Sequence, residues 1–72
     1  MEPIGTLIRR ELERQERSVT WFARKLSCDR SNVYRLFLKH SVDTALLQRI
    51  SVILNHNFFE DLSNNLPSAE NR

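Results

Sequence analysis

The stretch SVTWFARKLSCDRSNVYRLF, residues 18–37, decides the fold, because it predicts two short helices joined by a tight turn. Apolar or small residues recur at helical spacing in each half, and they are Phe22, Ala23 and Leu26 before the turn and Val33, Leu36 and Phe37 after it. Ser18 and Asp29 stand where the helices would begin, and such side chains accept hydrogen bonds from the free N–H groups of a first turn. We therefore expect one helix after Ser18 and a second from about Asp29 to Leu38.

Three further helices are expected around this pair. The first runs from about Gly5 to Arg17, with Arg9, Glu13 and Arg17 forming a charged ladder at four-residue spacing. Another begins after a cap at Asp43 and stops at residues 55–57, Asn-His-Asn. A last short helix holds Phe58, Phe59 and Leu62, of which Phe59 is expected to stay exposed. The prediction is one all-α domain of five helices, residues 1–63, followed by a disordered tail, residues 64–72.

Positive charge is concentrated on the central stretch, although the net charge of the chain is only +2. Residues 17–39 carry six Lys and Arg against one Asp, a net +5, whereas residues 1–16 carry −1 and residues 40–72 carry −2. A phosphate-binding surface requires such a concentration. The alternative reading is a basic face that is merely solvated.

The central stretch resembles the helix-turn-helix of the λ-repressor/Cro (XRE-like) family. The matching positions are Phe22, Ala23, Leu26, Cys28, Val33 and Leu36, and the resemblance extends over roughly residues 5–62. The family usually has Gln where this chain has Val19, and often Glu where it has Phe37. It usually has Gly in the turn, so Ser27 is expected to adopt a left-handed backbone here, at about 1 kcal/mol.

This resemblance implies a recognition helix that enters the major groove of DNA with its first turn. The residues that it assigns to base contacts are Arg30, Ser31 and Arg35, with Asn32 and Tyr34 as secondary candidates. Arg pairs with guanine and Asn with adenine, each through two hydrogen bonds. The residues expected at DNA phosphates are Ser18, Arg24, Lys25, Lys39 and His40. For His40, a simply solvated side chain is an equal alternative, and for Arg10 and Arg14 solvation is the preferred one.

Other function classes lack their sequence signals. No nucleophile with a base and no paired carboxylates are recognisable, and a chain with one glycine, Gly5, has no glycine-rich phosphate loop, so we expect neither an enzyme nor a cofactor. His40 and His56 lack the spacing and partners of a metal site. There is no apolar run of membrane-spanning length and no signal-peptide core, and the single cysteine, Cys28, fits a reducing compartment. A cytoplasmic, nucleoid-associated protein is expected.

Together these features predict a sequence-specific, DNA-binding transcriptional regulator acting as a repressor on double-stranded DNA. One helix-turn-helix reads few base pairs, so a homodimer on a palindromic site is expected, with Phe59 and Leu66 in its interface by analogy with the family. The alternative is an antitoxin-like or accessory module that uses the same fold to bind a protein partner. Val19 in place of Gln and the apolar pair Phe58 and Phe59 favour that alternative.

Overall fold

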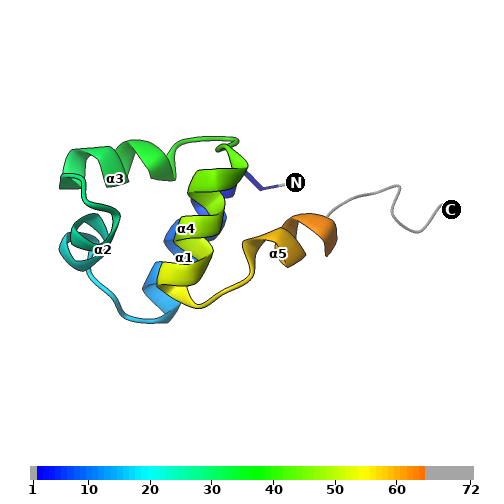
Figure 1. Cartoon of the computed structure of the whole chain (residues 1–72), viewed down its shortest axis with the longest axis horizontal. Coiled ribbons are helices and arrows are strands. Elements are labelled where there is room, and N and C mark those ends of the chain that lie inside the picture. Colours follow the sequence, from blue (N-terminus) through cyan, green and yellow to red (C-terminus); the bar gives the residue numbers. More distant parts are fainter. Residues whose placement is uncertain (1, 65–72) are drawn as a thin grey trace, which may run out of the picture.

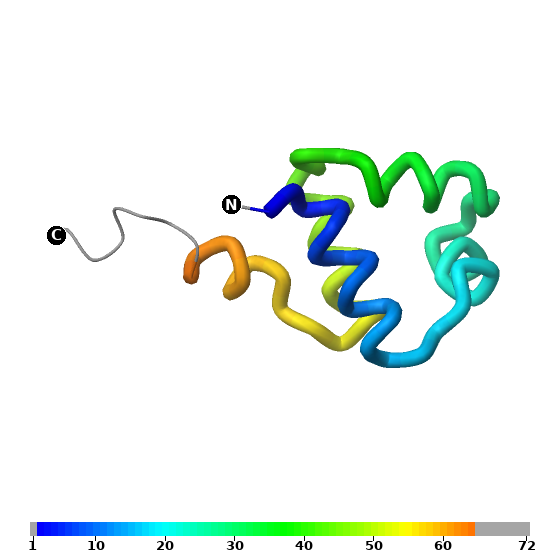
Figure 2. Tube along the Cα trace, turned by 180° about the vertical axis from the view of Figure 1, so that it is seen from behind, coloured from blue at the N-terminus to red at the C-terminus, as the bar shows by residue number. Residues whose placement is uncertain are grey.

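The computed structural model describes residues 2–64, and within them the chain is helical without any strand (Figure 1). Its helices are α1 (Ile4–Arg14), α2 (Val19–Leu26), α3 (Arg30–Phe37), α4 (Thr44–Leu54) and α5 (Phe58–Asn64). This confirms the expected all-α class with five helices. α4 lies in front of α1 in Figure 1 and behind it in Figure 2, with α2 and α3 at the opposite end from α5. The expected disordered tail lies outside the described residues, except that Asn64 ends α5.

Side chains predicted to cap the helices do so. The Ser18 Oγ accepts from the Trp21 N–H at 2.9 Å, and the Asp29 Oδ1 accepts from the Asn32 N–H at 3.1 Å. The Asp43 Oδ1 accepts from the Leu46 N–H at 2.7 Å. Each of these bonds satisfies a backbone donor that has no partner inside its own helix. The starts of α2, α3 and α4 are therefore encoded locally.

Helices α1, α2 and α4 end in the same way, on a residue in the left-handed region that is not glycine. These residues are Glu16 (φ 58°), Ser27 (φ 59°) and Asn55 (φ 52°). After α2, for example, the Ser27 N–H donates to the Arg24 carbonyl at 3.1 Å and the Cys28 N–H donates to the Ala23 carbonyl at 3.0 Å. This paired closure is a Schellman motif, whose left-handed position glycine normally fills. The expectation of a left-handed Ser27 is confirmed.

Replacing Ser27 with glycine is expected to raise the free energy of unfolding by up to about 1 kcal/mol, because glycine adopts this backbone without the Cβ repulsion that serine carries. Asn55→Gly is the control, since asparagine tolerates the left-handed region better and should gain less. Urea denaturation of the two variants and the wild type measures the difference. A Ser27→Gly domain less stable than wild type would show that the turn is not strained.

Helix α1 ends earlier than the sequence predicts. It stops at Arg14 rather than Arg17, because Glu16 reverses the chain and the Arg17 N–H closes back on the Leu12 carbonyl at 3.1 Å. The ladder prediction is therefore only half right. Arg9 and Glu13 do form an exposed ion pair at 3.9 Å, but the guanidinium of Arg17 instead lies 4.4 Å above the ring of Trp21. This cation–π contact joins Trp21 of α2 to the chain segment that follows α1.

The core is a single cluster to which every helix contributes. Its buried apolar residues are Ile4, Ile8, Leu12, Phe22, Ala23, Leu26, Val33, Leu36, Leu47, Ile50, Leu54 and Phe58. The apolar stripe predicted for residues 18–37 is buried as expected, with Phe37 and Cys28 half-buried at its edge. Phe58 is completely buried whereas its neighbour Phe59 is 37% exposed, as predicted. Burial of α2 and α3 on one side leaves their other sides to solvent.

Helix α1 closely approaches the end of α3 at Gly5. The N–H groups of Ile4 and Gly5, which open α1, donate to the carbonyls of His40 at 3.3 Å and Lys39 at 3.0 Å. A Cβ on Gly5 would lie 2.4 Å from the carbonyl oxygens of both Leu36 and Phe37. Only glycine fits between α1 and the end of α3. The backbone after α3 thus caps α1, and this contact fixes the position of α3.

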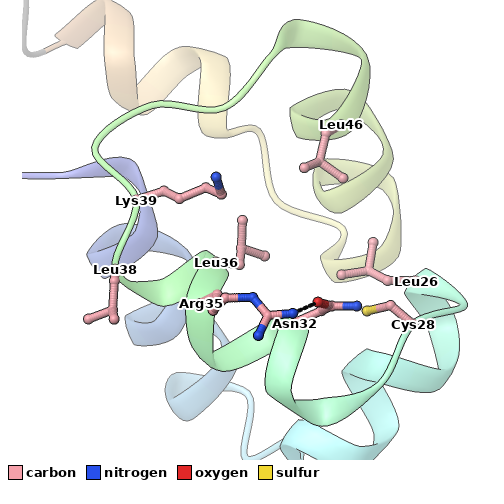
Figure 3. A pocket seen from close by; sticks show the side chains of 8 residues that line it. All are labelled: Leu26, Cys28, Asn32, Arg35, Leu36, Leu38, Lys39 and Leu46. Atoms are coloured by element: carbon pink, nitrogen blue, oxygen red, sulfur yellow. Dashed lines mark hydrogen bonds between the residues drawn. The ribbon is translucent and has the colours of Figure 1, made fainter.

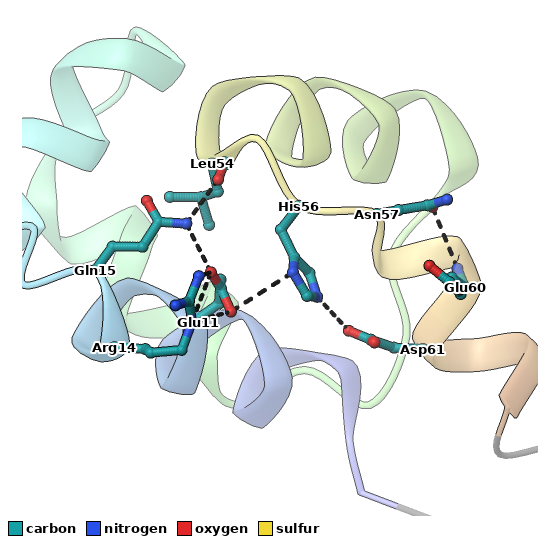
Figure 4. Close-up of polar contacts among 8 residues, drawn as sticks. All are labelled: Glu11, Arg14, Gln15, Leu54, His56, Asn57, Glu60 and Asp61. Carbon is teal, nitrogen blue, oxygen red and sulfur yellow. Dashed lines mark hydrogen bonds and ion pairs between the residues drawn. The ribbon is translucent and has the colours of Figure 1, made fainter.

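A polar network ties α1 to the opposite side of the domain (Figure 4). The buried carboxylate of Glu11 pairs with Arg14 and accepts from the Gln15 amide at 2.7 Å, and Gln15 also donates to the Leu54 carbonyl at 2.6 Å. The ring of His56 lies between two carboxylates, with Nδ1 3.6 Å from Glu11 and Nε2 2.6 Å from Asp61 of α5. The network therefore joins α1, the end of α4 and α5.

The domain is expected to lose stability in acid through Glu11. Hydrogen bonding from Arg14 lowers the pKa of this carboxyl, burial opposes that effect, and Gln15 and His56 support it. A lowered folded-state pKa gives stability that is complete above the ordinary value of about 4.3 and is lost as the pH falls through the folded-state value. Thermal melts of the wild type and Glu11→Gln should therefore converge below that range. An equal acid response in the variant would contradict this, and Glu13→Gln, on the exposed face of α1, is the control.

Candidate nucleic-acid interface

Helix α3 presents a continuous exposed face. Val33 and Leu36 are buried on its inner side, and all five candidate base-contact residues lie on the outer side or at the first turn: Arg30, Ser31, Asn32, Tyr34 and Arg35. Leu38, just after the helix, is 79% exposed. The ring of Tyr34 packs edge-on against Phe37 with 6.1 Å between ring centres. The structure therefore brings these candidates together on one surface.

Hydrogen bonds at the start of α3 define which groups are free to bind. Asp29 accepts from the Ser31 hydroxyl at 2.7 Å as well as from the Asn32 N–H. The bond from Ser31 is the main cause of a lowered pKa for Asp29, with the Asn32 N–H as second cause. Asp29 is thus a carboxylate at neutral pH. The proton of Ser31 is committed to it, so the Ser31 oxygen faces solvent as an acceptor.

Arg35 and Asn32 are hydrogen-bonded to each other on the exposed face of α3. The guanidinium Nη2 of Arg35 donates to the Oδ1 of Asn32, as Figure 3 shows. Sequence reasoning treated these residues as independent candidates and missed the pair. The three-residue spacing was a signal for it, because residues three apart are neighbours on a helix surface.

The candidate phosphate contacts flank this face on two sides. Arg24 and Lys25 are exposed in the last turn of α2, and the Lys25 Nζ lies 5.9 Å from the centre of the Trp21 ring. Lys39 and His40 are exposed after α3, on backbone whose carbonyls cap α1. Ser18 uses its oxygen as the cap of α2, which leaves its hydroxyl proton as a donor.

Ion pairing divides the cations of the described residues into two groups. Arg9, Arg10 and Arg14 of α1 pair with Glu13, Glu2 and Glu11. Within residues 2–64, by contrast, no ion pair involves Arg24, Lys25, Arg30, Arg35 or Lys39. The three arginines of α1 are therefore partly neutralised by neighbouring carboxylates, although such exposed pairs are weak. Arg17 and Arg49 are in no ion pair of the described residues either, but Arg17 lies over the Trp21 ring and Arg49 donates to the Leu26 carbonyl at 3.4 Å. Most of the cations without an ion pair therefore lie on α2, α3 and the loop that follows.

A hollow of about 510 Å³ lies between α3 and the start of α4 (Figure 3). Its lining is mainly apolar, with three polar side chains, and consists of Leu26, Cys28, Leu36, Leu38, Leu46, Asn32, Arg35 and Lys39. The face of α3 is therefore bordered by a concave surface on the side of α4.

A second exposed apolar area lies around α4 and α5. Val52 is 75% exposed and borders a shallow hollow of about 600 Å³ together with Phe59 and Asn57. The sequence interpretation named Phe59 but not Val52. A single apolar residue on the exposed side of α4 gives no periodic signal in the sequence. The other residue assigned to a dimer interface, Leu66, lies outside the described residues.

Neither a metal-binding cluster nor a membrane-spanning helix is found within residues 2–64. No group of three or more His, Cys, Asp or Glu side chains in that part of the chain is placed to hold a metal ion. None of its helices is long and apolar enough to cross a membrane. Comparison with known proteins identifies no relative: no family model, no curated protein and no solved structure matches the chain.

Proposed function

We propose that this protein is a sequence-specific, DNA-binding transcriptional regulator of the λ-repressor/Cro helix-turn-helix type, in which α3 reads the major groove. The observation that carries the proposal is the group of cations without ion pairs on α2, α3 and the loop after α3, beside an exposed face of α3 with mostly polar side chains. Direct readout needs such a face, and binding to the duplex needs cations that are free to replace counterions.

Within this proposal, residues of α3 contact bases and the flanking residues hold the phosphate backbone. Arg30, Ser31, Asn32, Tyr34 and Arg35 face the groove, while Ser18, Arg24, Lys25, Lys39 and His40 flank it. The protein acts as a repressor in the cytoplasm, at the nucleoid. It reads a palindromic site as a homodimer, since one recognition helix specifies only a few base pairs.

Fluorescence anisotropy with a mixed-sequence duplex tests the proposal, in salt from about 50 to 200 mM. Wild-type affinity should fall steeply with salt, and Arg30→Ala/Arg35→Ala should bind at least about fivefold more weakly. Arg9→Ala/Arg10→Ala is the matched control, because it removes the same charge from α1, where carboxylates already pair with these arginines. No wild-type binding at the lowest salt would refute the proposal. Equal losses of affinity in the two double variants would show that the chain binds DNA only through non-specific charge attraction, which would refute a specific role of α3.

The alternative, an antitoxin-like or accessory protein-interaction module, is favoured by one observation. Val52 and Phe59 are exposed apolar side chains beside one hollow, and Val52 also borders a second hollow that Lys25 lines. A protein partner on that surface would depend on Phe59 and not on Arg35. Partner capture that Phe59→Ala abolishes and Arg35→Ala leaves intact, in a chain that binds no DNA, would establish this function in place of the first.

A further inference from the structure

The exposed pair formed by Asn32 and Arg35 carries an inference about which base the protein reads. We infer that Arg35 reads a guanine and that Asn32 is a positioning residue that holds the guanidinium, rather than a reader of adenine. This inference rests on the proposed DNA-binding function. It concerns the base pair opposite the second turn of α3.

The side-chain oxygen of Asn32 is already engaged in a hydrogen bond within α3. A bidentate adenine contact uses the amide oxygen to accept from N6 and the amide nitrogen to donate to N7. In this protein the Asn32 Oδ1 already accepts from the Arg35 Nη2. An adenine N6 donor could use only the second lone pair of this oxygen and would share the oxygen with a cationic donor, which weakens the contact. The contact that would make Asn32 an adenine reader is therefore compromised.

The hydrogen-bond donors that remain on Asn32 and Arg35 determine which base edge the pair can contact. A guanidinium has five N–H donors, so four remain on Arg35, and the Asn32 amide nitrogen adds two. The pair thus presents six donors and one remaining oxygen lone pair. In the major groove guanine presents two acceptors, N7 and O6, whereas adenine places an amino donor beside its N7. Guanine is the base whose edge matches this surface at both positions.

The hydrogen bond to Asn32 also affects the orientation of the Arg35 side chain. Nothing buries the guanidinium, which is exposed, and no carboxylate within residues 2–64 pairs with it. Its hydrogen bond to Asn32, one helical turn earlier, restricts its rotamers, and its charge also interacts with the Asp29 carboxylate (Figure 3). A long side chain loses conformational freedom on binding, and holding it in advance reduces that loss. Asn32 thus contributes to guanine recognition through Arg35.

Selection of duplexes from a random library, followed by affinity measurements on the selected site, tests the inference. We expect a guanine whose preference disappears in Arg35→Ala. Exchanging that G·C pair for A·T should weaken wild-type binding roughly 5- to 150-fold, the equivalent of about 1–3 kcal/mol. Replacing the guanine by 7-deazaguanine, which lacks the N7 acceptor but keeps its pairing, should weaken the wild type and leave Arg35→Ala unchanged.

A double-variant cycle tests the role of Asn32. If it acts through Arg35, Asn32→Ala should lower the preference for the same guanine, and Asn32→Ala/Arg35→Ala should bind no more weakly than Arg35→Ala. Additive losses, or an adenine preference lost at another position in Asn32→Ala, would overturn the inference while leaving DNA binding intact. Thermal melts should be unchanged in all variants, since both side chains are exposed. A library from which no duplex is selected would refute the proposed function and this inference together.

Discussion

Replacing Gly5 with alanine is expected to lower the free energy of unfolding by about 3 kcal/mol, at the upper end of the effect of overpacking. The added Cβ would stand 2.4 Å from two backbone carbonyl oxygens, those of Leu36 and Phe37, and backbone cannot move aside as a flexible side chain can. At about 4–8 °C per kcal/mol for a domain of this size, the melting temperature should fall by roughly 12–24 °C. Circular dichroism during heating measures this directly.

The sign of this effect makes the experiment decisive. At an ordinary helix position, glycine to alanine stabilises a protein by about 0.5–1 kcal/mol because alanine is the better helix former. Gly5 lies in the first turn of α1, so a variant that melts at or above the wild-type temperature would show that α1 and the end of α3 do not meet closely. Glu13→Ala, at an exposed position of the same helix, should change stability by less than about 0.5 kcal/mol.

Replacing Phe58 with alanine is expected to cost about 3–5 kcal/mol, the range for truncating a large buried aromatic residue. Phe58 is completely buried in the core, so its truncation would leave a cavity there. Since total stability near 0.05–0.15 kcal/mol per residue amounts to about 4–11 kcal/mol here, the variant should be close to unfolding. Urea denaturation at low temperature, followed by circular dichroism, measures the loss.

The adjacent phenylalanine supplies the control. Phe59 has the same chemistry but is 37% exposed, so Phe59→Ala should destabilise the domain far less than Phe58→Ala. Similar losses of stability in the two variants would mean that both phenylalanines, and not Phe58 alone, contribute to the core. A stable Phe59→Ala protein is also the variant needed to examine the surface around Val52 for partner binding.

Much of the helical architecture was predictable because it depends on interactions within a few residues. Ser18, Asp29 and Asp43 cap helices through backbone groups three residues away, and the apolar stripe of residues 18–37 is buried as its spacing indicates. The left-handed Ser27 was implied by the family resemblance, because glycine usually occupies this turn position in the family. The main error in the helix boundaries, the end of α1 at Arg14, arose because charge spacing continues through Arg17 while the backbone reverses at Glu16.

The candidate interface was predictable as a set of residues but not as a set of interactions. Helical periodicity placed all five candidates on the exposed side of α3, because burial of Val33 and Leu36 determines which residues remain outside. Which cations are neutralised depends on side-chain geometry, and Arg10 pairs with Glu2 eight residues away. The pairing of Arg35 with Asn32 has the right spacing, but spacing alone does not show which rotamer an exposed arginine adopts.

The sequence by itself determined the helices, their caps, their buried faces and the concentration of positive charge at residues 17–39, since these follow from local chemistry and periodicity. Only the tertiary structure decided the contacts between residues far apart in the chain. In the sequence, Gly5 serves only to exclude a glycine-rich phosphate loop. In the structure, glycine is required at this position because α1 meets the carbonyls of Leu36 and Phe37 there. Glu11 likewise joins α1 to His56. Such contacts depend on how packed helices are placed in three dimensions, which no local pattern of residues encodes.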